Sequence, residues 1–465
     1  MKMRNRNIDF TQGKLLKLVV AYAIPLIFAG LIQTMFNAAD MAVLGAFDKS
    51  SDSSAVGAIG ATGAIISLLV NSMIGLSGGT NVMLARAVGA KDEDRAQKIV
   101  GSSLVLSVVI GVVMTTVGLI SARWFLMITD CPANSFDGAL TYLYIYIAAT
   151  PAILIYNFGS AIIRVSGDSR SPFIYILISG AANVVLNLVL CIILEEKVAA
   201  VAIATLIANV IGAILTVMHL IRLKDGPCRV DLKNLRFSMR ETLNVLVLGL
   251  PNAFTTALYS ISNIQIQGAI KSFGSSASAG NNASAQVEGF VSTIVTAIST
   301  TAMVAVGQNI GAGEKERVKH SIALCVLINF AISLVLGYGA LALGRPLLRI
   351  FVPNDALAVE IGRMRLLSLL TIYFVMAIDN TISSSIRAFG YTMLPMYNSV
   401  VTVILFRTIW MNFIYPNMTF SGDPVKDIMN VYECYIISWL MSIAVQIVLF
   451  AIVYARYMKG KGKEI

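Results

Sequence analysis

The sequence has 465 residues, of which 57% are hydrophobic and only 13% are charged, and its mean hydropathy is +0.78. Because a soluble protein carries about 25% charged residues, this composition excludes an ordinary soluble protein and indicates a polytopic membrane protein. The formal net charge of +10 fits either nucleic acid or an anionic membrane surface, and the positions of the basic residues decide between these partners.

The predicted elements are apolar helices that cross a bilayer. Apolar runs of about 20 residues, the length that spans the hydrocarbon, recur between short polar breaks, and helices satisfy the backbone polar groups there. We therefore predict an all-α membrane protein with twelve transmembrane helices. The predicted spans are residues 15–47, 55–80, 97–122, 138–162, 172–194, 198–221, 241–268, 283–306, 318–343, 358–386, 394–416 and 431–456.

The basic residues gather in every second connection between these spans. If the N-terminus is cytoplasmic, most of the Lys and Arg residues lie in the two terminal segments and in the connections on the inner side. This bias predicts that both termini are cytoplasmic. Topology and an anionic lipid bilayer thereby explain the positive charge, so we expect no nucleic-acid partner.

The first predicted span holds a proline and an aspartate. Pro25 lies early in this apolar run, and Asp40 follows fifteen residues later with more apolar sequence beyond it. A carboxylate inside a membrane helix costs on the order of 3 kcal/mol, so it usually faces a cavity, a partner or an ion. Asp40 is therefore the first functional candidate, and the structural alternative is an aspartate near the headgroups at a helix end.

Three further polar side chains share the predicted depth of Asp40 or lie one turn from it. At about 1.5 Å per residue, Asp40, Asn187 and Thr205 each lie about 12 to 13 Å below the outer face. Asn183 precedes Asn187 by one turn on the same helix face. One carboxylate with several neutral oxygens suits a bound proton or a weak sodium site. The structural alternative is hydrogen bonding between helices.

The two halves of the chain repeat one another at a nearly constant offset. ARAVGAKDEDRAQK from Ala85 matches VGQNIGAGEKERVK from Val306, and RVSGDSRSP from Arg164 matches RAFGYTMLP from Arg387. Pro251 matches the early proline of the first span. We therefore predict two parallel six-helix lobes, 1–223 and 241–465, joined by a cytoplasmic linker, 224–240, which is a transporter architecture.

These paired motifs, with Pro25 and Asp40, resemble the multidrug and toxic compound extrusion (MATE) family, in a superfamily that also contains lipid-linked oligosaccharide flippases. The resemblance covers essentially the whole chain. It implies an antiporter of a bacterial cytoplasmic (inner) membrane. Such an antiporter exports amphiphilic, often cationic, organic compounds in exchange for H+ or Na+ by alternating access.

The resemblance also assigns roles to residues of the first lobe. Asp40, Asn183, Asn187 and Thr205 fall at positions similar to the family's cation site, where proton or cation binding is linked to bending of the first helix near its proline. Pro25 is accordingly the expected hinge. Some archaeal members have an aspartate where Asn187 stands, and a single carboxylate leaves the choice between H+ and Na+ open. The helix 7 carboxylate of the sodium-coupled NorM-like branch has no counterpart here.

The second lobe has acids of its own. Glu288 and Arg407 lie at similar predicted depths, about 10 and 14 Å below the outer face, which favours a structural ion pair over a substrate-binding role for Glu288. Asp379, beside Asn380, lies in the inner half of its span and is the better candidate for contact with a drug or an ion.

An exporter of bulky cations needs a deformable cavity lined by methionine and aromatic side chains. The candidates for such a lining are Met35, Phe36, Tyr156, Tyr259, Met303 and Tyr373. Each of these side chains also has ordinary helix packing as its alternative.

We expect small organic substrates, a monomer, no cofactor, and no metal beyond a sodium ion at Asp40. The five cysteines are scattered and lack CxxC spacing, which argues against a zinc site. Within transport, the alternative is a lipid-linked precursor flippase or a dedicated metabolite exporter. An intramembrane serine hydrolase is the alternative from another class: Ser77 lies in a GxSxG pattern, but the only histidines, His219 and His320, lie at predicted cytoplasmic helix ends.

Overall fold

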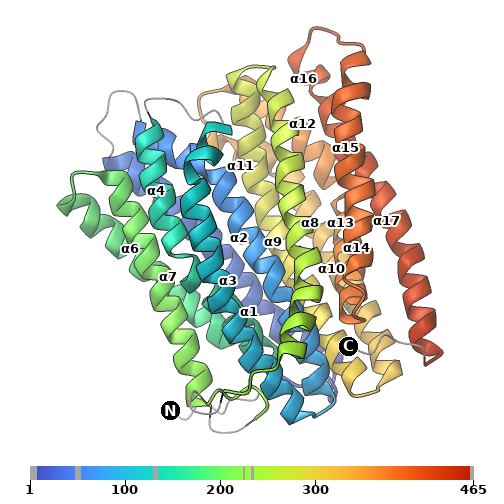
Figure 1. Ribbon diagram of the computed structural model, residues 1–465. Coiled ribbons are helices and arrows are strands. Elements are labelled where there is room, and N and C mark those ends of the chain that lie inside the picture. Colours follow the sequence, from blue (N-terminus) through green and yellow to red (C-terminus); the bar gives the residue numbers. More distant parts are fainter. Residues whose placement is uncertain (1–7, 48–53, 129–134, 224–225, 232–234, 461–465) are drawn as a thin grey trace. The chain divides into compact units, whose positions relative to one another are not determined.

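The computed structural model describes residues 8–47, 54–128, 135–223, 226–231 and 235–460. Within these ranges the chain is built from helices and contains no strand (Figure 1). The first half comprises α1 (Leu15–Phe47), α2 (Ser54–Gly89), α3 (Glu93–Ile128), α4 (Phe136–Ala148), α5 (Thr150–Val165), α6 (Arg170–Ile193) and α7 (Lys197–Arg222).

The second half begins with α8 (Met239–Lys271), α9 (Ser275–Gly311), α10 (Lys315–Ala342), α11 (Gly344–Phe351), α12 (Ala356–Leu370) and α13 (Tyr373–Ala388). One irregular span follows, in which two π-helical turns interrupt the α-helix. Its parts are α14 (Met393–Ser399), the π-helical η2 (Val400–Leu405), α15 (Phe406–Ile409), the π-helical η3 (Trp410–Ile414) and the 3₁₀ turn η4 (Tyr415–Asn417). The last helices are α16 (Pro424–Asp427) and α17 (Met429–Met458).

The number of apolar helices agrees with the sequence. In the described ranges, ten helical segments are long and apolar enough to cross a membrane. The pairs α4–α5 and α12–α13 are bent by 44° and 49°, and they give twelve spans when each pair counts as one. The predicted all-α, multi-span fold is confirmed, and the cytoplasmic placement of the two termini stays a prediction.

The internal repeat extends to the hydrogen bonds of the turns. After α2, Lys91 has φ of +57° and the N–H of Asp92 donates to the carbonyl of Ala87 at 3.0 Å. After α9, Gly313 has φ of +74° and the N–H of Glu314 donates to the carbonyl of Asn309 at 3.0 Å. Both turns end a helix with a residue in the left-handed region, so the matched sequence motifs build matched turns.

The helix order repeats as well. α1 and α8 are both 33 residues long, and each contains one proline, Pro25 and Pro251. The bent pairs α4–α5 and α12–α13 occupy corresponding places in the two halves, and each is followed by a turn with a left-handed glycine, Gly167 or Gly390.

The chain divides into two compact units. Unit 1 comprises Met1–Asp9 and Ala21–Ala253, and unit 2 comprises Phe10–Val20 and Phe254–Ile465. The divisions fall inside α1 and α8, so each unit takes a part of both helices. The sequence-based boundaries, 1–223, 224–240 and 241–465, stay a prediction.

A short N-terminal segment is fixed within unit 2 by polar contacts at the α9–α10 turn. Phe10 is fully buried, and its N–H donates to Gln308 Oε1 at 3.0 Å. Arg317 Nη2 donates to the carbonyl of Phe10 at 2.8 Å and to that of Gly13 at 3.2 Å. The second-half motif VGQNIGAGEKER therefore contacts the start of the chain as well as forming a turn.

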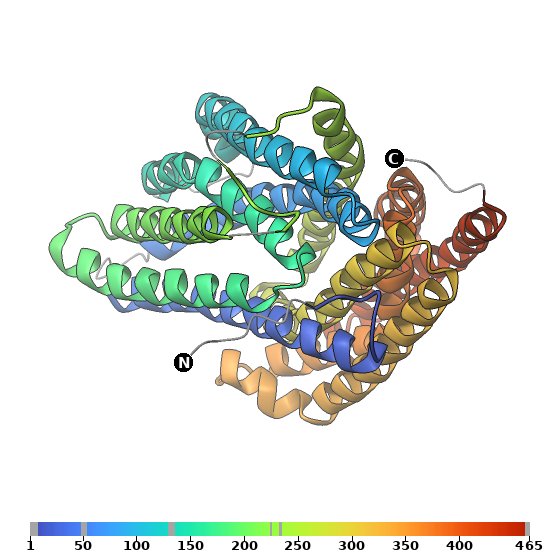
Figure 2. The ribbon, with the colours of Figure 1, turned by 90° about the horizontal axis from the view of Figure 1, so that it is seen from below.

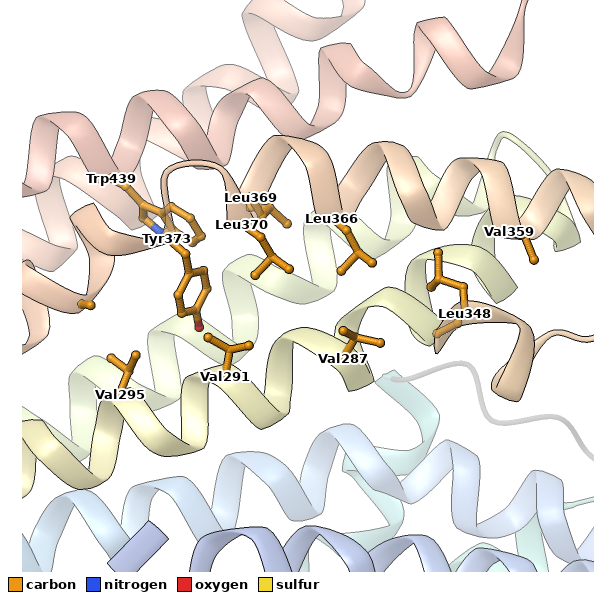
Figure 3. Packing of buried hydrophobic residues seen from close by; sticks show 12 residues of the cluster. Val287, Val291, Val295, Leu348, Val359, Leu366, Leu369, Leu370, Tyr373 and Trp439 are labelled. Carbon is orange, nitrogen blue, oxygen red and sulfur yellow. The ribbon is translucent and has the colours of Figure 1, made fainter. Parts of the chain in front are cut away.

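The core of unit 2 is an apolar cluster between α9, α12, α13 and α17. Tyr373 is fully buried and meets the Trp439 ring edge-on at 5.7 Å between ring centroids. Its side chain points toward α9, where Val291 and Val295 pack (Figure 3). The prediction that Tyr373 lines a cavity is wrong, because this ring fills the hydrophobic core instead.

In unit 1, glycines allow α2 and α8 to approach closely. A Cβ on Gly79 would lie 2.2 Å from the carbonyl oxygen of Val245, and one on Gly249 would lie 2.3 Å from that of Leu76. Gly75 and Gly79 form a GxxxG pattern, which membrane helices use for close packing. The neighbouring helices α6 and α7 pack side by side (Figure 2).

Candidate functional site

The structure brings the four polar residues predicted for the first lobe into one chain of hydrogen bonds. Asn187 Nδ2 on α6 donates to Asp40 Oδ1 on α1 at 2.5 Å and to Asn183 Oδ1 at 3.3 Å. Asn183 Nδ2 donates to Thr205 Oγ1 on α7 at 3.3 Å. We call Asp40, Asn183, Asn187 and Thr205 the N-site.

Local helix geometry places these groups. Asn183 and Asn187 are one turn apart on a single face of α6, and both are buried. Thr205 Oγ1 donates to the carbonyl of Val201 in the preceding turn at 3.0 Å, which leaves its lone pairs for Asn183. Asp40 is half-buried.

The N-site has an oxygen acceptor that is not used. Asn187 Oδ1 is buried and has no hydrogen-bond partner. Such an atom costs free energy unless a ligand or a proton donor meets it. Together with the Asp40 carboxylate it offers the hard oxygen ligands that suit a sodium ion, or an acceptor for a carboxylic acid proton. The described residues contain no group of three or more His, Cys, Asp or Glu that could hold a metal ion.

A glycine that sequence reasoning missed lets α1 lie close to α6. A Cβ on Gly180 would lie 1.8 Å from the Phe36 ring, so only glycine permits this contact. Phe36 precedes Asp40 by one turn, and Gly180 precedes Asn183 by nearly one turn. The Phe36–Gly180 contact therefore holds α1 beside the asparagines. Its sequence signal was a glycine within an otherwise apolar span.

An apolar cluster borders the N-site. Tyr142, Cys191 and Val201 belong to a buried cluster of α4, α6 and α7, and Val43 on α1 packs against it. Val43 follows Asp40 by three residues, so the carboxylate lies next to a hydrocarbon environment. Such surroundings strengthen the electrostatic interactions of a charge.

In the second lobe the predicted ion pair has a different partner. Glu288 Oε2 on α9 accepts from Arg365 Nη2 on α12 at 2.6 Å, and Arg365 Nη1 donates to Ser284 Oγ at 3.2 Å. The predicted Glu288–Arg407 pair is therefore wrong. Similar predicted depth did not give contact, because α9 and α15 present these side chains to different neighbours.

Arg407 has its own surroundings on α15. Its Nε donates to Ser438 Oγ on α17 at 3.1 Å, and its guanidinium carbon lies 4.2 Å from the centroid of the Tyr435 ring. The residue is only 2% exposed. It is a buried cation held by a hydroxyl group and an aromatic face.

Asp379 on α13 lies in a polar group with α14 and α17. Ser442 Oγ donates to Asp379 Oδ2 at 3.2 Å, while Asp379 Oδ1 is buried without a hydrogen-bond partner. Asn398 Nδ2 donates to Ser442 Oγ at 3.1 Å and to Gln446 Oε1 at 2.7 Å. Asn380 is half-buried next to Asp379. The chemistry of this group suits a ligand with hydrogen-bond donors.

The other cavity candidates lie in varied surroundings. Met35 is 62% exposed, Tyr259 is half-buried and Met303 is buried. Tyr156 donates from its hydroxyl to the carbonyl of Pro172 at 3.2 Å. Met35 is thus the candidate with the largest exposed fraction.

The residues of the hydrolase alternative do not form a dyad. Ser77 Oγ donates to the carbonyl of Ile74 at 2.8 Å. His219 Nδ1 is hydrogen-bonded to the Tyr175 hydroxyl, and His320 Nδ1 to the carbonyl of Glu316, each at 2.7 Å. The GxSxG pattern is instead part of the close packing of α2 against α8.

Comparisons with known proteins agree with this architecture. The family model MatE matches residues 25–193 and 251–413. "Probable multidrug resistance protein YoeA" of Bacillus subtilis is 26% identical over 396 residues, covering 84% of this chain and 83% of that protein. "Probable multidrug resistance protein NorM" of Thermotoga maritima is 24% identical, covering 85% of this chain and 83% of that protein.

Two further similarities bear on fold and substrate. A solved structure described as the outward-facing conformation of a multidrug resistance MATE family transporter has a TM-score of 0.87 at 19% identity, covering 98% of this chain and 99% of the other. An "FAD transporter" of Shewanella oneidensis is 22% identical over 269 residues, covering 56% of this chain and 58% of that protein.

Proposed function

Because this chain belongs to the MatE family of multi-pass membrane transporters, we propose that it is a secondary active multidrug antiporter. It exports amphiphilic, often cationic, organic compounds across a bacterial cytoplasmic membrane in exchange for H+ or Na+. It acts as a monomer without a cofactor, with both termini in the cytoplasm, and it is not an enzyme.

The N-site carries this proposal. Asp40 is the one carboxylate in the described hydrogen-bond chain, and it contacts Asn187 at 2.5 Å beside the unpartnered Asn187 Oδ1. A carboxylate next to apolar packing avoids an uncompensated charge in two ways: it binds a counter-ion, or it takes up a proton and becomes neutral. Binding and release of one proton or one sodium ion at Asp40 thus changes the local charge by one.

Pro25 is the hinge through which this charge change acts. α1 passes from unit 2 to unit 1 between Val20 and Ala21, four residues before Pro25. Proline removes one helix hydrogen bond and weakens the helix at that point. Protonation or ion binding at Asp40 alters the hydrogen bond to Asn187, and with it the preference of α1 for a straight or a bent path.

A narrower substrate range is the second candidate function. The relative named as an FAD transporter supports a dedicated metabolite exporter. In that case the coupling at Asp40 is the same and only the cargo differs.

The proposal is tested with purified protein in proteoliposomes. Export of the methyl ester of tetramethylrhodamine, an amphiphilic cation, is followed under an imposed proton gradient and then under a sodium gradient. Asp40→Asn should abolish ion-driven export and leave binding of the dye in detergent largely intact. The gradient that drives the wild type identifies the coupling ion.

The control is Asp137→Asn, the same change at an exposed acid of α4, which should export normally. Undiminished antiport by Asp40→Asn would refute coupling at the N-site. Failure of the wild type to export the dye under either gradient would refute multidrug antiport itself.

A further inference from the structure

Arg407 is a buried cation without a counter-charge among the described residues. It is 2% exposed, and a guanidinium stays protonated in a protein. The ion pairs of unit 2 join Arg345 and Arg363 to Glu360, and Arg365 to Glu288, which leaves Arg407 without a carboxylate within 4.0 Å. A buried charge in this situation is costly unless a ligand compensates it.

The contacts of Arg407 hold its guanidinium in place and leave its terminal nitrogens available. Nε donates to Ser438 Oγ at 3.1 Å, and Ser438 in turn donates to the carbonyl of Tyr435 at 2.9 Å. The Tyr435 ring covers one face of the guanidinium. No described residue accepts from Nη1 or Nη2, and these atoms are not sealed from solvent, in contrast to the unpartnered Nε of Arg365 and Arg387.

The backbone around Arg407 is unusual. The four-residue α15 that carries it lies between the π-helical turns η2 and η3. π-Helical turns are rare and occur frequently at functional sites. They widen the helix on both sides of Arg407. This irregularity is independent of the charge argument and points to the same residue.

We propose that Arg407 binds an anionic group, a carboxylate or a phosphate, of exported compounds. The two terminal N–H groups of a guanidinium match the two oxygens of such a group. The transporter therefore accepts zwitterionic and anionic amphiphiles in addition to plain cations. This inference rests on the proposed export function and extends its substrate class.

The test compares two probes that differ in one group, tetramethylrhodamine with its free carboxylate and the methyl ester of the same dye. Binding to purified protein in detergent is measured by fluorescence anisotropy, without an ion gradient. Arg407→Met should weaken binding of the free acid roughly ten- to a hundredfold and leave binding of the ester unchanged. Arg407→Lys, which keeps the charge but loses the fork, should lie between.

The control is Arg363→Met, which removes an exposed arginine of α12 and should change neither affinity. Ester binding by Arg407→Met shows that the variant is folded. If Arg407→Met does not fold, Arg407→Lys is judged by the same comparison, with loss of affinity for the acid alone as the supporting result.

Three results would overturn the proposal: wild-type protein that does not bind the free acid, unchanged acid binding by the Arg407 variants, or an equal loss for both dyes. Because dye binding is measured without an ion gradient, a failure of ion coupling at Asp40 would not change the measured affinities. Conversely, loss of this anion subsite leaves export of the cationic ester as a separate measure of the proposed function.

Discussion

Glu288 and Arg365 should be coupled in stability, and Glu288 and Arg407 should not. The Glu288–Arg365 contact is 2.6 Å, with 18% and 8% of the two side chains exposed, so both charges are close to fully buried. Removing one partner from such a pair leaves an uncompensated charge and costs about 3 to 5 kcal/mol. In Glu288→Gln, Arg365 loses its counter-charge and keeps only neutral acceptors, the new amide oxygen and Ser284 Oγ. We expect a fall in Tm on the order of 10 °C.

The assay is a double-mutant cycle on protein purified in detergent, with thermal unfolding followed at one fixed scan rate because such unfolding is often irreversible. Arg365→Met should destabilise about as much as Glu288→Gln. The double variant Glu288→Gln/Arg365→Met should lose much less than the sum of the two single variants, because it leaves no uncompensated charge.

The control cycle pairs Glu288→Gln with Arg407→Met. Glu288 and Arg407 form no ion pair with each other, so this pair should show little coupling. Additive losses for Glu288 and Arg365, or a strong coupling of Glu288 to Arg407, would refute the assignment of the ion pair.

Three other predictions test separate features. Gly79→Leu should prevent assembly of unit 1 and abolish a monodisperse peak in size-exclusion chromatography, because α8 backbone lies 2.2 Å from the new Cβ; Gly268→Ala, with open space around it, should elute like the wild type. Lys91→Gly should raise Tm, because glycine adopts the left-handed backbone of this turn without strain. Gly313→Lys should lower the free energy of unfolding by about 1 kcal/mol at the matching turn. A Tm equal to that of the wild type for both variants would contradict backbone strain at these turns. Asp355 caps α12, and the hydrogen bond from the Ala358 N–H lowers the pKa of its carboxyl. Its stabilising contribution is present above about pH 4, the ordinary pKa, and is lost as pH falls through the lowered pKa, so Asp355→Ala should be less stable at neutral pH and converge with the wild type in acid.

The N-site was predictable because depth in a membrane helix follows from counting residues. A rise of about 1.5 Å per residue put Asp40, Asn187 and Thr205 at one level, and two asparagines one turn apart defined the face of α6. The turn after α9 could also be predicted, because a left-handed residue at a helix end is usually a glycine, here Gly313.

The direction of a side chain around its helix axis did not follow from depth. Glu288 and Arg407 were predicted at similar depths, yet Glu288 points to Arg365, a residue of the predicted span 358–386. The prediction that Tyr373 lines a cavity was wrong because tyrosine is suited to a hydrophobic core as well as to a cavity wall. Gly180 was missed because its role depends on the Phe36 ring of another helix.

Each unit contains a part of α1 and a part of α8, and this constrains when each unit can form during synthesis. Phe10 is synthesised about three hundred residues before its partners Gln308 and Arg317. Unit 1, in turn, needs residues up to Ala253, beyond the linker. A nascent chain that ends at the linker therefore has neither unit complete, and expression of two halves separated there should give stable protein only when both are made in the same cell.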